Sequence, residues 1–253
     1  MPAGGSPVEL RPAAAGAGGW EPLFESLAPE SEPAGPAGLP RVVAIMVASA
    51  DGRTTVDGRS VALGHPADRD LLRGLRARAD AVLVGSRTLA VERYGALLDR
   101  EAAEQRVARG QTPHPLVATI SRDGSLPAGL PLLAEPGVPV LVFAEKSGEP
   151  PAGTAAAVRF EECPGDLSAA SVKRRLGEHG ARLVAFEGGA GLLGLMLAGG
   201  AVDDLLLTVA PQVAAGDGRP IVAAAALALP LSLRATWRAD DHLFLHYRIG
   251  SRH

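Results

Sequence analysis

Residues 182–200 combine three features that restrict the fold of the chain: a short apolar run, a glycine turn and a second apolar segment. The run Leu183–Phe186 has the length and composition of a buried strand, and Glu187 ends it. Two glycines follow, and residues 192–197 have helical character. Glycine lets the backbone approach an anion closely, and the first turn of a helix carries unpaired N–H groups. The stretch therefore predicts a phosphate-binding turn between a strand and a helix.

Strand and helix patterns alternate along most of the chain. Six further apolar runs are expected to be strands: residues 41–49, 81–84, 116–120, 138–143, 158–160 and 204–210. Helical patterns lie between them, at residues 65–78, 97–109 and 168–179. This alternation predicts an α/β fold with a mainly parallel sheet covered on both faces. Two strand-like runs near the end, residues 231–237 and 243–249, predict an antiparallel hairpin that makes the sheet mixed.

The composition of the 253-residue chain excludes several classes of function. A net charge of −3 gives no general attraction for nucleic acid, and no apolar run is as long as a membrane-spanning helix. The one cysteine, Cys163, excludes an internal disulfide and a cysteine-rich zinc site. We therefore expect a cytoplasmic enzyme that acts on a small molecule and uses no metal, no nucleic acid and no membrane.

The first 38 residues differ in composition from the rest of the chain. They are dominated by Ala, Gly, Pro and Glu, and are expected to form a disordered or loosely docked tail. Within the tail, four residues form an apolar stripe that would dock on the main domain or remain unstructured: Trp20, Leu23, Phe24 and Leu27. No repeat and no second change of composition occurs, so residues 39–253 are expected to form one domain.

Residues 189–194 match the pattern G-x-G-x-x-G, after a strand and at the start of a helix, as in dinucleotide-binding Rossmann units. A Rossmann unit also needs an acidic residue at the end of the next strand, where it binds the ribose. Here Asp203 and Asp204 precede that strand, and residues 209–212 at its end carry no acid. The pattern therefore favours a phosphate-binding turn over a complete Rossmann unit. A glycine turn that only packs tightly is the alternative.

Three strand ends carry polar groups of the kind that bind ligands. Asp51 follows the first strand, residues 85–88 (Gly-Ser-Arg-Thr) follow the second, and Glu187 ends a third. Open α/β sheets bind ligands at the carboxyl ends of their strands. Glu187 would accept hydrogen bonds from a heterocycle, Asp51 would orient a reducible ring or pass on a proton, and Arg87 would hold a phosphate. A solvated strand end and an Asp-Gly turn are the alternative interpretations of the two carboxylates.

An ordered set of motifs between about residues 41 and 249 resembles the reductase domain of riboflavin biosynthesis, the C-terminal half of bifunctional deaminase–reductases. The matching segments are residues 49–52 (S-x-D-G), 58–60 (G-x-S), 75–77 (L-R-A), 80–88 (D-A-V-L-V-G-x-x-T), 187–189 (E-G-G) and 202–211 (V-D-E-L-x-L-T-x-x-P). Each motif alone is modest, but the ordered set is specific. The resemblance implies a dihydrofolate-reductase-like fold, an α/β three-layer sandwich with a mixed, mainly parallel sheet and a C-terminal antiparallel hairpin.

The resemblance also implies an activity and a set of site residues. The enzyme would use NADPH to reduce 5-amino-6-(5-phosphoribosylamino)uracil, or a close analogue, to the ribitylamino form. Asp51 would lie beside the hydride-transfer centre, and three residues would line the substrate site: Ser60, Arg76 and Glu187. The residues implied to bind the cofactor are Ser49, Gly85, Arg87, Thr88, Gly188, Gly189, Ala190, Gly191, Leu192 and Leu193. A homodimer is also implied, whose interface would cover the edge of the closing hairpin.

The chain departs from the family pattern at several places. Many members carry Lys four residues before the S-x-D-G motif, where this chain has Ile45, and residues 92–95 (Glu-Arg-Tyr-Gly) replace the usual D-D-P-x-L. An arginine that helps to hold substrate phosphate has only Arg93 and Arg100 as candidates. One cysteine cannot supply the zinc site of the deaminase half, so a stand-alone reductase is expected. A reductase of dihydrofolate or another pterin, and a non-catalytic nucleotide-binding paralogue, are the alternatives.

Overall fold

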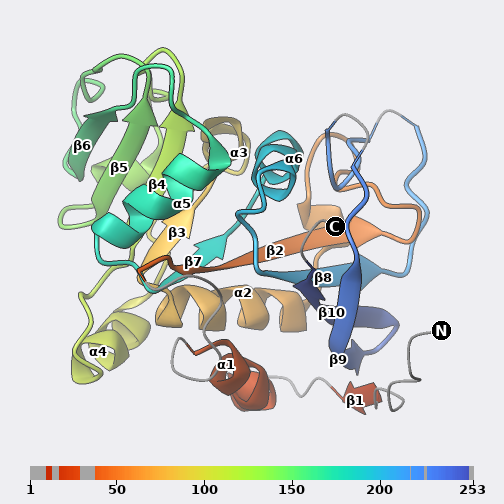
Figure 1. The fold of residues 1–253 in the computed structure, drawn as a ribbon. Coiled ribbons are helices and arrows are strands. Elements are labelled where there is room, and N and C mark those ends of the chain that lie inside the picture. Colours follow the sequence, from red (N-terminus) through yellow and green to blue (C-terminus); the bar gives the residue numbers. More distant parts are fainter. Residues whose placement is uncertain (1–9, 13–16, 29–37, 217, 225–226, 251–253) are drawn as a thin grey trace.

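A computed structural model describes residues 10–12, 17–28, 38–216, 218–224 and 227–250, and one ten-stranded sheet runs through it (Figure 1). The strands are β1 (Leu10–Pro12), β2 (Arg41–Ser49), β3 (Ala81–Leu83), β4 (Leu116–Ser121), β5 (Pro139–Ala144), β6 (Ala157–Glu162), β7 (Leu183–Phe186), β8 (Asp204–Ala210), β9 (Leu231–Ala239) and β10 (His242–Ile249). The α-helices are α1 (Glu21–Leu27), α2 (Pro66–Arg78), α3 (Ser86–Val91), α4 (Arg100–Ala108), α5 (Ala169–Glu178) and α6 (Ala190–Ala198). Short 3-10 turns are η1 (Ala17–Trp20), η2 (Val61–Leu63) and η3 (Pro131–Ala134).

The central strands of the sheet are parallel, as the alternation of strands and helices predicts. The order is β1-β9-β10-β8-β2-β7-β3-β4-β5-β6, and the strands from β8 to β6 all pair in parallel. β10 is antiparallel to both β8 and β9, which forms the expected closing hairpin. The mixed, mainly parallel sheet predicted from the sequence is therefore confirmed.

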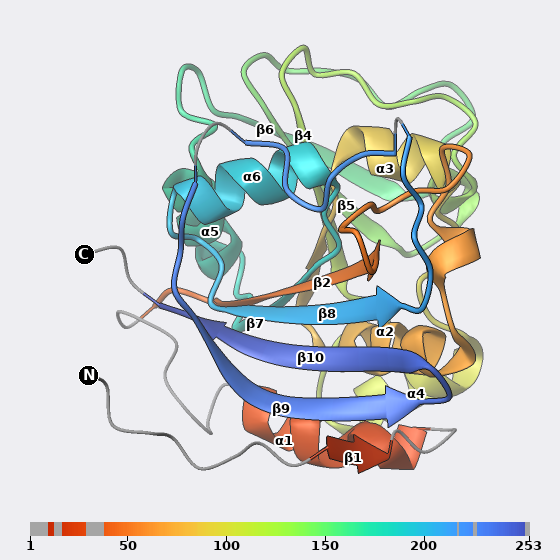
Figure 2. The ribbon, with the colours of Figure 1, turned by 90° about the vertical axis from the view of Figure 1, so that its right-hand side faces the viewer.

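Helices cover both faces of this sheet, which gives three layers (Figures 1 and 2). α1 and α2 pack on one face, and α5 and α6 on the other. Alternate residues of β2 enter the two layers, Val43 on the α2 side and Ala44 on the α6 side. Burial on both faces is why β2 reads as a continuous apolar run rather than an alternating one. None of the described helices is long and apolar enough to cross a membrane.

Element boundaries follow the sequence pattern closely in the long elements and less closely in the short ones. β2 and β8 begin and end at the expected residues, and α2 ends at Arg78 as expected. Residues 86–88 belong to the expected loop after the strand, but they form the start of α3, which continues to Val91. This six-residue helix has Gly85 as its N-cap and no side-chain cap, and it is anchored by Leu89, which is almost fully buried.

The apolar stripe near the N-terminus is part of the hydrophobic core. Its four residues are at most 3% exposed: Trp20, Leu23, Phe24 and Leu27. The Trp20 ring lies 5.5 Å from that of Trp237 and 5.1 Å from that of Phe244, between ring centroids. Gly74 of α2 makes room for Phe24, because a Cβ at this position would lie 2.4 Å from the ring. Residues 1–9, 13–16 and 29–37 of the expected tail lie outside the described residues.

The outer edge of the closing hairpin is partly covered by the chain itself. β1 pairs in parallel with β9, from Leu10 beside Thr236 to Pro12 beside Arg238. Unpaired edges are the places where another chain adds on. The sequence argument for a dimer through this edge is therefore weakened at the end of β9 that β1 occupies.

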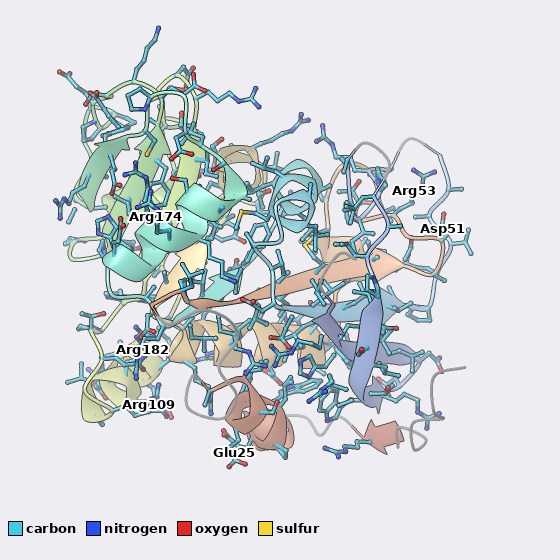
Figure 3. The ribbon with its side chains drawn as sticks, in the orientation of Figure 1. Glu25, Asp51, Arg53, Arg109, Arg174 and Arg182 are labelled. Carbon is cyan, nitrogen blue, oxygen red and sulfur yellow. The ribbon has the colours of Figure 1, made fainter. Side chains whose placement is uncertain are left out.

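Phe24→Ala is expected to lower the free energy of unfolding by about 3–5 kcal/mol, because it empties a buried ring site between α1 and α2. The Arg78 guanidinium also lies over the Phe24 ring, with Cζ of Arg78 4.2 Å from the ring centroid. Urea denaturation measures the change. Glu25→Ala, on the exposed side of the same helix (Figure 3), is the matched control and should leave the midpoint unchanged. Equal midpoints for the two variants would show that α1 adds nothing to stability.

Candidate active site

The turn between β7 and α6 lies at the carboxyl end of three adjacent parallel strands. β7 pairs with β2 on one side and β3 on the other. The Gly85 N–H donates to the Gly188 carbonyl at 2.8 Å, which joins the turn to the end of β3. Gly188 has a φ of +75°, and a Cβ there would lie 2.7 Å from the Met46 Sδ of β2. Both observations explain why the turn needs glycine at this position.

A cavity of about 590 Å³ opens beside this turn. Its volume lies within the range of small-molecule sites, roughly 300–1,000 Å³. Six residues expected from the sequence line it: Ser60, Arg87, Thr88, Glu187, Gly189 and Ala190. The rest of the wall comes from parts of the chain without such an expectation, among them Asp68 and Leu72 of α2, Tyr94, and residues 214–216 and 218–219.

A longer groove, of about 1290 Å³, runs from the same turn toward the ends of β4 and β5. Gly85, Gly191 and Leu192, all expected to bind cofactor, line this groove. Cavity and groove share five lining residues: Arg87, Thr88, Gly189, Ala190 and Arg219. The two spaces therefore meet at the N-terminus of α6, and an extended ligand reaches both.

The N-terminus of α6 has the chemistry of an anion site. Gly189 is its N-cap, and no described side chain caps the helix. Leu193 N–H donates to the Gly189 carbonyl at 2.8 Å, so the groups without an intrahelical acceptor belong to residues 190–192. A Cβ on Gly191 would meet nothing within 4 Å, which leaves the approach open. Backbone N–H groups and the helix dipole both favour a phosphate here.

Glu187 is held by two partners within the cavity wall. Arg76 of α2 donates from Nε to Oε1 and from a terminal nitrogen to Oε2, each at 2.6 Å. The Tyr94 hydroxyl donates a short hydrogen bond to Oε2, and the Arg76 guanidinium lies 5.2 Å from the Tyr94 ring centroid. The Glu187 side chain is 3% exposed. A bidentate ion pair of this kind stabilises the charge of a carboxylate and also fixes its position.

Burial and the Glu187 charge act on the two partners. Burial raises the pKa of Tyr94, and the neighbouring Glu187 raises it further, so this pKa is well above the ordinary value for tyrosine. Burial lowers the pKa of Arg76, but the Glu187 charge outweighs it and the net shift is upward. Arg76 and Tyr94 therefore keep their protons, and Glu187 stands between two permanent donors.

Asp51 lies outside both spaces, in the exposed turn after β2 (Figure 3). Its carboxylate accepts hydrogen bonds from the Ser49 hydroxyl at 2.6 Å and from the N–H groups of Ala214 and Ala215, each at 2.9 Å. The Ser49 bond, followed by these backbone bonds, lowers the pKa of Asp51 to about 2. Asp51 thus fastens a loop that lines the cavity, and does not itself face the space where a ring would bind.

Four other residues that were expected to bind substrate or cofactor line neither the cavity nor the groove. Ser49 is buried, and its hydroxyl serves the turn that contains Asp51. Arg76 reaches the cavity through Glu187. Gly188 shapes the glycine turn, and the Leu193 side chain is fully buried in the core beneath α6. Ser60 does line the cavity, where its hydroxyl donates to Glu92 at 2.8 Å.

Asp68 is the acidic residue that sequence reasoning missed. It stands in the first turn of α2, where a carboxylate complements the helix dipole. The structure places it in the cavity wall, where its Oδ1 accepts a 2.5 Å hydrogen bond from the Thr208 hydroxyl of β8. Burial raises the pKa of Asp68, opposed by the Thr208 bond and by His242, His65 and Arg69.

Residues 40–244 match the sequence profile of a family described as the RibD C-terminal domain. The chain belongs to this family. The match spans well over half of the chain and includes β2, β7 and the glycine turn. A comparison with curated protein sequences found no match.

Solved structures share the fold of this RibD C-terminal domain. A pyrimidine reductase-like protein from Corynebacterium diphtheriae superposes with a TM-score of 0.70 at 24% identity, over 84% of this chain and 93% of that one. Acinetobacter baumannii RibD gives 0.70 at 21%, over 85% of this chain and 59% of the longer RibD chain. The riboflavin biosynthesis reductase Rib7 of Saccharomyces cerevisiae gives 0.66 at 19%, over 91% and 100%. The family resemblance is thus confirmed, and the fold is the one that these structures share.

Tyr94 is expected to stay protonated at pH 10.0, the ordinary tyrosine pKa, because burial and the Glu187 charge both disfavour the phenolate. The ultraviolet absorbance of tyrosinate in the folded protein measures this. Wild type and Tyr94→Phe should give the same tyrosinate signal at that pH. A larger signal in the wild type would contradict the buried hydrogen bond to Glu187.

Proposed function

We propose that this member of the RibD C-terminal domain family is an NADPH-dependent reductase of 5-amino-6-(5-phosphoribosylamino)uracil or a close analogue. Family membership makes the chain an oxidoreductase of the riboflavin pathway type. The observation that carries the proposal is the meeting of cavity and groove at the N-terminus of α6. A dinucleotide has this extended form, with a pyrophosphate between two nucleosides. The groove would take one nucleoside and the cavity the reactive ring with the substrate.

The donor set at α6 fits the cofactor. The N–H groups of residues 190–192 would hold the pyrophosphate, and Gly191 leaves them accessible. Arg87 borders both spaces, so its guanidinium is the candidate partner of the 2′-phosphate that distinguishes NADPH from NADH. When bound, the nicotinamide supplies the hydride; the protein aligns the reacting carbon and excludes water.

The substrate ring is assigned to the part of the cavity that Glu187 faces. Glu187 accepts three hydrogen bonds from Arg76 and Tyr94, which leaves one lone-pair direction, on Oε1, for a ring N–H group. Arg76 and Tyr94 are positioning residues in this scheme, because they act through Glu187. Asp51 takes a positioning role as well, since it fastens residues 214 and 215 of the cavity wall.

Purified protein mixed with NADPH and the ribosylamino-pyrimidine phosphate should consume the NADPH absorbance and yield the ribitylamino product, identified by its mass. Dihydrofolate offered in the same assay tests the pterin alternative. Turnover of dihydrofolate alone would transfer the assignment to a pterin reductase. Tight NADPH binding without turnover of either compound would favour a nucleotide-binding protein without catalysis.

Arg87→Ala is expected to weaken NADPH binding by roughly 10- to 100-fold and to leave NADH binding nearly unchanged. A hydrogen bond to a charged group contributes about 1.5–3 kcal/mol, and 1.4 kcal/mol is tenfold in affinity. Cofactor fluorescence titration gives both dissociation constants. Arg122→Ala, at another position of the same groove, is the comparison variant. If Arg122→Ala and not Arg87→Ala removes the preference for NADPH, the 2′-phosphate assignment is wrong.

A further inference from the structure

The cavity contains a carboxylate whose partners leave one of its oxygens unused. Asp68 Oδ1 accepts from the Thr208 hydroxyl at 2.5 Å. Among the described residues, Oδ2 has no hydrogen-bond partner, although Asp68 lines the cavity. The helix end does not need this carboxylate, because His65 Nδ1 already accepts from the Ala67 N–H at 3.1 Å and caps α2. Asp68 therefore has a free oxygen in a place where helix capping does not explain it.

Comparison with the other acids of the cavity singles out Asp68. Four carboxylates line the cavity among the described residues: Asp57, Asp68, Glu92 and Glu187. Glu187 is held between Arg76 and Tyr94, Glu92 accepts from Ser60, and Asp57 is exposed in a turn. Burial raises the pKa of Asp68. Asp68 therefore combines an unused oxygen in the cavity with an environment that favours its protonated form.

The surroundings of Asp68 place that proton on Oδ2. Thr208 donates to Oδ1, so Oδ1 acts as the acceptor oxygen and the proton belongs on the other one. His242 of β10, His65 and Arg69 are the titratable groups whose charges act on Asp68, and Asp240 pairs with His65 at 3.1 Å. His242 is itself held toward its neutral form by burial and by His65, which lower its pKa. The bond between Thr208 and Asp68 joins β8 to the first turn of α2.

We propose that Asp68 is a catalytic residue that donates the proton taken up by the substrate nitrogen during reduction. A ribosylamine opens to a C=N bond, and its reduction adds a hydride to carbon and a proton to nitrogen. The Oδ2–H bond breaks and an N–H bond forms, while the hydride from the reduced nicotinamide enters at carbon with the electron pair of the new C–H bond. Asp68 is left as a carboxylate, which a solvent proton restores after the product leaves.

This proposal rests on the proposed reductase function for its kinetic test, but the protonation of Asp68 is testable without cofactor. Infrared difference spectra of the ligand-free protein, wild type minus Asp68→Asn, should show a protonated-carboxyl band at about pH 5, where an ordinary aspartate is mostly ionised. Absence of the band would overturn the proposal whatever the substrate is. Asp70→Asn, on the same helix and outside the cavity, is the control and should leave the band in place.

With the ribosylamino-pyrimidine phosphate, Asp68→Asn should lower kcat by about 10²- to 10⁴-fold, the usual contribution of a general acid, and leave NADPH binding intact. Thr208→Val tests the role more finely. It removes the hydrogen bond that lowers the pKa of Asp68, so the pKa of Asp68 should rise. The pH at which kcat falls, as Asp68 loses its proton, should therefore be higher than in the wild type. An unchanged kcat in Asp68→Asn, in an active wild type, would overturn the proposal. An inactive wild type would overturn the substrate assignment instead, and the infrared band would then decide the role of Asp68.

Discussion

The ion pair between Arg76 and Glu187 is the interaction on which the site depends. Glu187 ends a central strand and is almost fully buried, and a buried charge is tolerated only when it is paired and hydrogen-bonded. Removing one partner of such a pair costs about 3–5 kcal/mol. Arg76 ties α2 to the end of β7, and Tyr94 adds the segment after α3. Three distant parts of the chain are thus fixed around one carboxylate, and the cavity wall takes its shape from them.

The sequence predicts the long elements well because their causes are local. β2 and β8 are buried on both faces and read as continuous apolar runs, and α2 has Pro66 at its start and leucines at helical spacing. The short helices are different, since isolated helices of six or seven residues are not stable by themselves. α1 packs on α2, and Trp20, the residue just before α1, packs against Trp237 and Phe244. The sequence pattern does not show that Gly74 is the residue whose missing side chain leaves room for the Phe24 ring.

The same distinction separates the predictable part of the site from the rest. The glycine turn is recognisable because backbone conformation and close approach are requirements of the turn itself. Asp51 and Asp68 each stand next to the end of an element, yet one is exposed and the other lies in the cavity. The difference comes from partners far along the chain, Ala214 for Asp51 and Thr208 for Asp68. The only local hint was that Asp68 stands four residues before Leu72, on the inner stripe of α2.

The cavity has two chemically different ends. Arg87 and Arg219 border the end shared with the groove, whereas Asp68 and Ile45 line the cavity alone. A lysine at position 45, as many family members carry, would place a cation on the wall that holds Asp68. An opposite charge nearby favours the ionised form of a carboxyl group, so Asp68 would lose its proton. Ile45 leaves that part of the cavity wall without such a cation, so no charge at position 45 opposes the proton that the proposal places on Asp68.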